Sequence, residues 1–186
     1  MGGLSQGMSQ SGPGYMKYMG QLSLANNGGF SQIRMDIDDG IFSGAEGIEL
    51  RVRGTDPNRK FKIFATASTS DWNLNMWEAD LPALQADWFT VRVPFDQLKL
   101  QIMGEYVENG GLISGDMVKK IGFFIMDKNT DEFEMHVEYI KPYGQTQAWF
   151  QLRFLVDYRT FIFPRHKSPS DSSIVKPKIR LLKNYR

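Results

Sequence analysis

Short segments in which apolar and polar residues alternate recur along this chain, and they restrict it to a β-rich fold more than any other feature. Ile33, Met35 and Ile37 alternate with polar residues shortly after the turn sequence Asn-Asn-Gly-Gly. A period of two places the apolar side chains on one face of a strand, and Gly and Asn adopt positive φ angles at little cost. We therefore expect strands at residues 20–25 and 30–37, joined as a β-hairpin.

The same alternation predicts further strands. In residues 47–53, Ile48, Leu50 and Val52 are expected to face the core, and residues 60–66 are expected to form the partner strand. Because strands recur with turns and no segment has a convincing amphipathic-helix spacing, the sequence predicts an all-β sandwich or barrel. Residues 149–163 could form either a helix or a pair of short strands. Other strands are expected near Met76–Trp77 and at residues 88–95, 121–126 and 133–140, and loops at residues 1–14 and 96–115.

Several of these segments form an ordered series that is distinctive as a set. The series resembles the CIA30 family, the complex I intermediate-associated protein 30 domain, and the resemblance extends over residues 1–143. Each segment alone is a common strand pattern, so the resemblance depends on their order. The segments are Met-Gly-Gly-Leu-Ser at residues 1–5, Gly-Gln-Leu-Ser-Leu at residues 20–24, Asn-Asn-Gly-Gly-Phe at residues 26–30, and residues 47–54, 88–95, 121–128 and 133–140.

The resemblance implies a fold and a role. It implies a jelly-roll β-sandwich of the galactose-binding-like type and a non-catalytic assembly factor, or chaperone, for respiratory complex I (NADH:ubiquinone oxidoreductase). The implied partners are protein subunits or other assembly factors of complex I in mitochondria, although the family also occurs in plastids and bacteria. Because the chain starts at the Met-Gly-Gly element, we expect the family's first strand and any presequence to be missing. We expect neither a cofactor nor a nucleic acid partner.

Charge divides the chain into two parts. Residues 144–186 contain nine basic and two acidic residues, whereas the remainder contains 13 basic and 19 acidic residues. Together with the end of the resemblance at Tyr143, this predicts a β-sandwich domain at residues 1–143 and a basic, partly disordered tail at residues 144–186. The absence of cysteine excludes disulfides and thiolate chemistry.

The basic tail allows two interpretations. Its cations, together with Trp149, Phe150 and Phe154, would suit peripheral contact with an anionic membrane surface. Its second half is rich in Ser and Pro and cannot bury enough apolar surface to fold. The abrupt end of the resemblance is consistent with an alternative gene end.

A group of cations lies on the polar positions of three predicted strands or beside them. If these strands are neighbours, the cations form a stripe that could meet an acidic partner surface, since arginine is favoured at interfaces. The alternative is an ordinary solvated face of an antiparallel sheet. The group consists of Arg51, Arg53, Lys60, Lys62 and Arg92. Arg51, Arg53, Lys62 and Arg92, together with Trp77, are our candidate partner-binding residues.

Three tryptophans, Trp72, Trp77 and Trp88, lie in or beside a long polar and aromatic stretch. Exposed on loops, they could anchor a protein partner or stack on sugar rings. The alternative is a small apolar core beneath the loop at residues 68–84, because large aromatic residues are mostly buried. A carbohydrate-binding module is therefore the alternative function, since the implied fold also occurs in sugar-binding domains.

Neither a metal site nor a catalytic site emerges from the residue pattern. Carboxylates at residues 36–39 precede a glycine, but Gly47 stands where an EF-hand loop needs its bidentate glutamate. His136, flanked by Glu134 and Glu138, is expected to be a surface histidine on an outward strand face, without the nucleophile and orienting group of a catalytic set. We therefore predict neither an enzyme nor a metal-binding protein.

Overall fold

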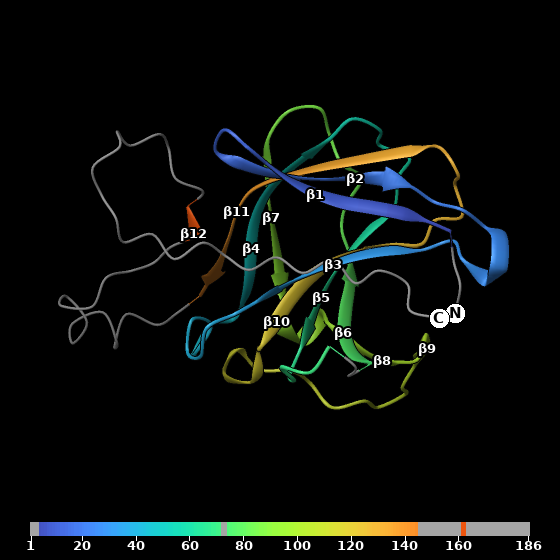
Figure 1. Cartoon of the computed structure of the whole chain (residues 1–186). Helices are drawn as coiled ribbons and strands as arrows, with labels where there is room; N and C mark the ends of the chain where they lie inside the picture. Colours follow the sequence, from blue (N-terminus) through green and yellow to red (C-terminus); the bar gives the residue numbers. More distant parts are fainter. Residues whose placement is uncertain (1–3, 72–73, 145–160, 163–186) are drawn as a thin grey trace.

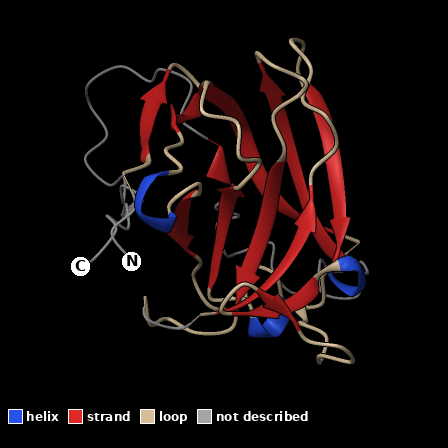
Figure 2. Cartoon of the chain, turned by 90° about the vertical axis from the view of Figure 1, so that its right-hand side faces the viewer, coloured by secondary structure: helices blue, strands red, loops and turns tan. Residues whose placement is uncertain are grey.

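The computed structural model describes residues 4–71, 74–144 and 161–162. They form two antiparallel sheets packed face to face, which appear as two layers of strands in Figures 1 and 2. Sheet A contains, in spatial order, β1 (Gln6–Gly12), β2 (Tyr15–Gln21), β11 (Glu132–Tyr143), β4 (Gly47–Gly54) and β7 (Phe89–Pro94), and β12 (Phe161–Ile162) pairs with β11. Sheet B contains β3 (Ser31–Asp36), β10 (Lys120–Ile125), β5 (Phe61–Thr66), β6 (Asn75–Asp80), β8 (Lys99–Ile102) and β9 (Glu105–Tyr106). The all-β sandwich prediction is confirmed.

The core lies between the sheets and is built from the alternation in the sequence. Ile48, Leu50 and Val52 of β4 are fully buried, as predicted, and they pack with residues of β5 and β10 from the opposite sheet. Burying each such side chain stabilises the fold by roughly 1.5–3 kcal/mol. β10 is buried on both faces, because Phe124 packs with Phe64 on the side away from the core. This confirms the prediction of a covered central strand.

The predicted hairpin at residues 20–37 is wrong. β2 belongs to sheet A and pairs with β1 and β11, whereas β3 belongs to sheet B and pairs with β10. The Asn-Asn-Gly-Gly segment carries the chain from one sheet to the other, through a 3-10 turn at Ala25–Asn27. Positive φ angles do occur there, at Asn26 (φ 55°) and Gly29 (φ 98°). The local conformation was thus readable from the sequence, but the pairing partner was not.

Three further sequence expectations differ from the structure. β4 and β5 lie in different sheets and are not partners. Residues 1–14 were expected to be a loop, but Gln6–Gly12 forms β1, which pairs with β2 despite its Gly/Ser/Gln composition. Residues 96–115 contain β8 and β9. Two short 3-10 turns, Phe95–Gln97 and Gly115–Met117, flank these strands.

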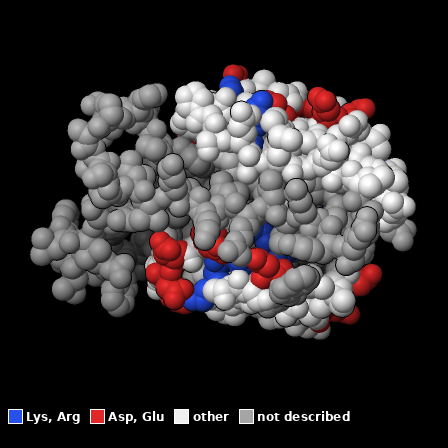
Figure 3. All heavy atoms as spheres, in the orientation of Figure 1, with Lys and Arg blue, Asp and Glu red and all other residues white. Residues whose placement is uncertain are grey.

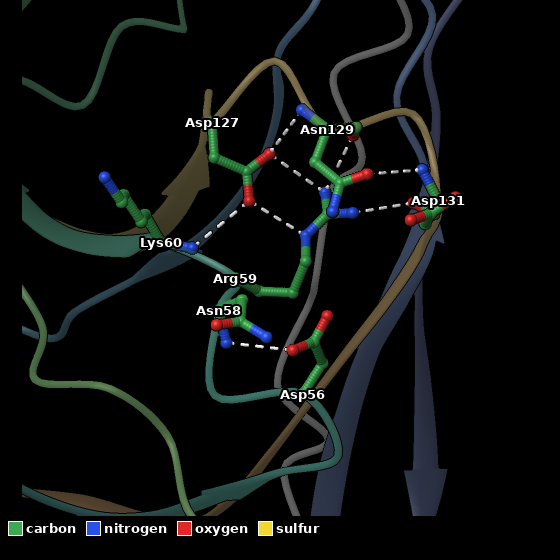
Figure 4. Close-up of polar contacts among 7 residues, drawn as sticks. All are labelled: Asp56, Asn58, Arg59, Lys60, Asp127, Asn129 and Asp131. Atoms are coloured by element: carbon green, nitrogen blue, oxygen red, sulfur yellow. Dashed lines mark hydrogen bonds and ion pairs between the residues drawn. The ribbon is translucent and has the colours of Figure 1, made fainter.

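Arg59, just before β5, fixes two loops to each other (Figure 4). Its side chain is 1% exposed, and its Nε lies 2.8 Å from Oδ2 of Asp127, which is 4% exposed. Its Nη groups donate to Oδ1 of Asp127 (3.1 Å) and to the backbone oxygens of Asn129 (3.1 Å) and Asp131 (2.8 Å). The ring of Phe133 lies 5.6 Å from the guanidinium. The loop between β10 and β11 is thereby attached to the loop between β4 and β5.

The proposed tail lies outside the described residues, apart from Gly144 and the two residues of β12. No helix in the described part of the chain is long and apolar enough to cross a membrane. The membrane-contact interpretation of Trp149, Phe150 and Phe154 therefore stays a prediction, as does the division into residues 1–143 and 144–186.

Candidate partner-binding face

The strand register brings three of the predicted cations together. Arg51 and Arg53 project from β4, and Arg92 projects from its neighbour β7, all on the side of sheet A that faces away from the core. Lys62 lies on β5, which belongs to sheet B, so the predicted stripe is divided between the two sheets. Lys60 is exposed in the segment before β5.

Pairing in sheet A adds residues from β2 and β11 to these arginines. Lys17 lies opposite His136, and His136 lies opposite Arg53. Lys141 lies opposite Glu49, and Glu49 lies opposite Arg92. We name this surface the arginine face. It comprises Tyr15, Lys17, Glu49, Arg51, Arg53, Trp88, Arg92, Glu134, His136, Glu138, Tyr139, Lys141 and Tyr143.

One end of the arginine face is a chain of four polar side chains. Arg53 Nε donates to Nδ1 of His136 at 2.9 Å. The other ring nitrogen, Nε2, lies 2.7 Å from Oε1 of Glu134, whose Oε2 accepts from Lys17 Nζ at 2.7 Å. Because Nδ1 accepts a hydrogen bond, the neutral ring carries its proton on Nε2 and donates to Glu134. The order is therefore cation, carboxylate, neutral imidazole, cation.

His136 is buried, with 7% of its surface exposed, so the prediction of a surface histidine is wrong. The ring stacks on Tyr15, with 4.8 Å between centroids, and lies 6.3 Å from the ring of Trp88. Burial lowers the pKa of His136, and the charges of Arg53 and Lys17 lower it further, whereas Glu134 acts in the opposite direction. Since both ring nitrogens are occupied, His136 is not placed to act as a general base.

Two aromatic rings flank the guanidinium of Arg53. The guanidinium carbon lies 4.8 Å from the centroid of Trp88 and 5.7 Å from that of Tyr15. The two rings meet edge to face, 6.0 Å apart, and both residues are half-buried. Such contacts attract a cation to the ring and restrict its rotamers.

The other end of the arginine face centres on Glu49, whose side chain is only 7% exposed. Its two oxygens contact Arg92 Nε (2.8 Å), Lys141 Nζ (2.9 Å) and the hydroxyl of Tyr139 (3.1 Å). Burial alone would raise the pKa of Glu49, but the hydrogen bonds from these three partners lower it below its ordinary value. Arg92 also lies over the ring of Tyr143, at 5.4 Å.

Arg51 occupies the middle of the face and pairs with Glu138, with 2.7 Å between Nε and Oε2. A register shift between Val137 and Tyr139 marks a β-bulge at this point of β11. The bulge explains why Glu138 and Tyr139, which are consecutive, both contribute to the same face.

The remaining candidates from the sequence lie elsewhere. Lys62, in sheet B, contacts Glu78 Oε1 (2.8 Å), Asp80 Oδ1 (3.2 Å) and the hydroxyl of Tyr106 (2.8 Å). Trp77 is 9% exposed, packs in the core and donates from Nε1 to the backbone oxygen of Gly111 at 2.6 Å. Neither residue belongs to the arginine face, and Trp72 lies outside the described residues.

The acidic turn at residues 36–39 is engaged by lysines. Lys120 Nζ lies 2.8 Å from Asp36 and 2.7 Å from Asp71, and Lys119 Nζ pairs with Asp39. Within the described ranges there is no group of three His, Cys, Asp or Glu residues that could hold a metal ion. In the view of Figure 3, basic groups likewise lie beside acidic ones rather than in a separate patch.

The family model described as Complex I intermediate-associated protein 30 (CIA30) matches residues 1–137. The chain belongs to the CIA30 family. No curated protein matches this CIA30 domain at a significant level.

The solved structures similar to this CIA30 domain include carbohydrate-binding modules. One is the family 11 module of the cellulosomal cellulase Lic26A-Cel5E of Clostridium thermocellum, with 17% identity, a TM-score of 0.57, and coverage of 77% of this chain and 84% of that chain. Another is the family 11 module from Clostridium thermocellum in complex with a β-1,3-1,4-mixed-linked tetrasaccharide, with 18% identity, a TM-score of 0.56, and coverage of 77% and 85%. At these identities the likeness shows the fold, a galactose-binding-like jelly-roll, and confirms that prediction.

Much of the arginine face of this CIA30 domain was absent from our sequence-based candidates. Glu134 was considered only as a neighbour of His136, and Glu49, Tyr15 and Lys17 were not among the candidates. The missing information was the strand order, because sequence alternation identifies a face but not the strand beside it. One signal was available in the sequence: Val137 and Ile140 are both apolar but three residues apart, which breaks the period of two and indicates a bulge. Both are buried in the structure.

Proposed function

We propose that this CIA30 domain is a non-catalytic assembly factor that binds intermediates of respiratory complex I. The observation that carries the proposal is the family match over residues 1–137. On the same ground we propose complex I subunits or other assembly factors as partners and mitochondria as the location. A plastid or a bacterium is the alternative location.

The arginine face supports binding of a protein. Arginine, tyrosine and tryptophan are the residues that most often dominate the energy of protein interfaces. Here Tyr15, Arg51, Arg53 and Trp88 are half-buried, and ion pairs or ring contacts hold them, as they hold the exposed Arg92, before any partner arrives. This reduces the entropy lost on binding. The face also spans β2, β11, β4 and β7, and so offers a broad and rigid sheet surface.

The same geometry argues against catalysis at His136. Both of its ring nitrogens are occupied by Arg53 and Glu134, and neither contact is to a nucleophile. A general base needs a free nitrogen within reach of a substrate proton. We therefore assign the Lys17–Glu134–His136–Arg53 chain to shaping the surface.

A carbohydrate-binding module is the second candidate. It is favoured by the fold shared with the family 11 modules and by the adjacent aromatic residues Tyr15 and Trp88. However, sugar binding needs an open ring face, and Arg53 lies over one face of Trp88. The Trp77 platform that we considered from the sequence is buried.

Affinity purification of the tagged chain from its own cells, followed by mass spectrometry and native-gel fractionation, tests the proposal. We expect complex I subunits to co-purify and to migrate with the chain in sub-complexes smaller than the mature enzyme. Absence of those subunits, together with retention of the purified chain on a glycan array, would favour the carbohydrate-binding module instead.

A further inference from the structure

Arg53 differs from the other two arginines of the arginine face in what compensates its charge. Arg51 contacts the carboxylate of Glu138, and Arg92 contacts that of Glu49. Arg53 donates to the neutral ring of His136 and contacts no carboxylate among the residues that the structure describes. Its positive charge is therefore available to a carboxylate from another molecule.

The unused donors of Arg53 are held in place. The hydrogen bond from Nε to His136 and the rings of Trp88 and Tyr15 fix the guanidinium on three sides. Within the described part of the chain, neither Nη group has a hydrogen-bond partner, and neither is among the buried unpaired atoms. A guanidinium presents parallel N–H donors that match both oxygens of a carboxylate.

The charge of the surroundings points to the same kind of ligand. The arginine face carries five cations and three carboxylates (Lys17, Arg51, Arg53, Arg92 and Lys141 against Glu49, Glu134 and Glu138). The chain outside residues 144–186 has 13 basic and 19 acidic residues, so this positive face lies on an acidic domain. An acidic segment is attracted to this face and repelled by the rest of the surface.

We propose that Arg53 is a receptor for an aspartate or glutamate side chain of an acidic partner segment, which docks beside Trp88 and Tyr15. The proposal rests on the proposed function for the identity of the partner, namely a complex I subunit or assembly factor. The recognition chemistry itself is testable without that partner.

The probe is a fluorescein-labelled hexaglutamate peptide, titrated with the full chain at low ionic strength and followed by fluorescence polarisation. We expect Arg53→Gln to weaken binding about tenfold or more, because hydrogen bonds to a charged group are lost. Arg53→Lys keeps the charge but lacks the planar fork, so its loss should be intermediate. Lys99→Gln is the matched control, since it removes one cation from an exposed position on sheet B and should change binding less than about twofold.

Equal binding of hexaglutamate by the wild type and Arg53→Gln would overturn the proposal that Arg53 is a receptor. The absence of hexaglutamate binding by the wild type would overturn it as well. Displacement of the peptide by a neutral mixed-linked β-glucan tetrasaccharide would also overturn it, in favour of a sugar site.

Circular dichroism of each variant shows whether the variant is folded. If Arg53→Gln is not folded, Arg53→Lys supplies the test. Co-purification of complex I subunits with the wild type and Arg53→Gln alike would contradict the receptor while leaving the assembly role intact. Peptide binding that depends on Arg53, with no complex I subunits recovered, would support the receptor and contradict the assembly role.

Discussion

Two arginines of this CIA30 domain show how the same side chain serves two purposes. Arg59 is 1% exposed, and its guanidinium contacts the carboxylate of Asp127 and two backbone oxygens of the same loop. Arg53 is half-buried, contacts only a neutral imidazole through Nε, and leaves both Nη groups without a partner among the described residues. Both lie against aromatic rings. The difference is the number of donors already satisfied within the chain, and it separates an arginine that holds the fold together from one that can bind.

The largest loss of stability is expected on replacing Arg59, whose N–H donors are already paired within the chain. Arg59→Met leaves the nearly buried carboxylate of Asp127 without its cation and two loop carbonyls without their donor. We expect the free energy of unfolding to fall by about 3–5 kcal/mol, the usual cost of removing one partner of a buried pair. Urea denaturation followed by tryptophan fluorescence measures it.

Arg53→Met is the matched control for this comparison, because Arg53 has no carboxylate partner and is only half-buried. We expect it to cost about 1 kcal/mol, mainly through lost ring contacts. Equal destabilisation by the two substitutions would remove the distinction between the two arginines.

The second effect concerns the pairing of Arg92. Glu49→Gln removes the negative charge that Arg92 and Lys141 share, at a side chain that is 7% exposed. Because those two cations can return to water, we expect a loss of only about 1–2 kcal/mol in urea denaturation. Hexaglutamate should bind this variant more tightly than the wild type, since the face has lost a competing carboxylate. Unchanged or weaker peptide binding by Glu49→Gln would show that Glu49 does not neutralise the charge of Arg92.

The third effect is a dependence of stability on pH that originates beside Arg53. The pKa of His136 is lowered in the folded state, so the unfolded chain takes up a proton first as the pH falls below about 6.5. The contribution of the neutral His136 ring to the free energy of unfolding is present above that pH. It is lost as the pH falls towards the pKa of His136 in the folded state. Between pH 6.5 and 5 the free energy of unfolding should decrease by at most about 1.4 kcal/mol per pH unit for this one group.

His136→Gln provides the control for that pH dependence. The amide of glutamine can accept from Arg53 and donate to Glu134, but it does not titrate. Urea denaturation at several pH values should therefore show a weaker slope for the variant than for the wild type. Identical slopes would mean that His136 takes no part in the pH dependence.

The contrast between these residues also shows what could be predicted from the sequence. Alternation placed Arg51, Arg53 and Arg92 on outward strand positions, and the structure agrees, because the period of two is a local property of a strand. It also placed Lys62 on an outward position correctly, but it could not show that β5 belongs to the other sheet, since that depends on contacts between segments far apart in the chain. It failed for His136 for a similar reason: the burial of an outward side chain depends on its neighbours, here Tyr15 and Trp88. The family resemblance indicated the fold correctly but carried no information on which arginine has unused donors.

The smallest effect on stability is expected for Glu138→Gln, a variant that tests whether an unpaired positive charge is sufficient for peptide binding. Arg51 and Glu138 are 42% and 39% exposed, so Glu138→Gln should change the free energy of unfolding by less than about 0.5 kcal/mol. The variant leaves Arg51 without a carboxylate, as Arg53 already is, but Arg51 has no histidine or tryptophan among its described contacts to orient it. If orientation matters, loss of the Glu138 carboxylate should tighten hexaglutamate binding only slightly, and replacing Arg53 by Gln should still hold the double variant Glu138→Gln with Arg53→Gln well below the wild type. Recovery of binding in the double variant would mean that positive charge alone, and not the geometry around Arg53, recognises the peptide.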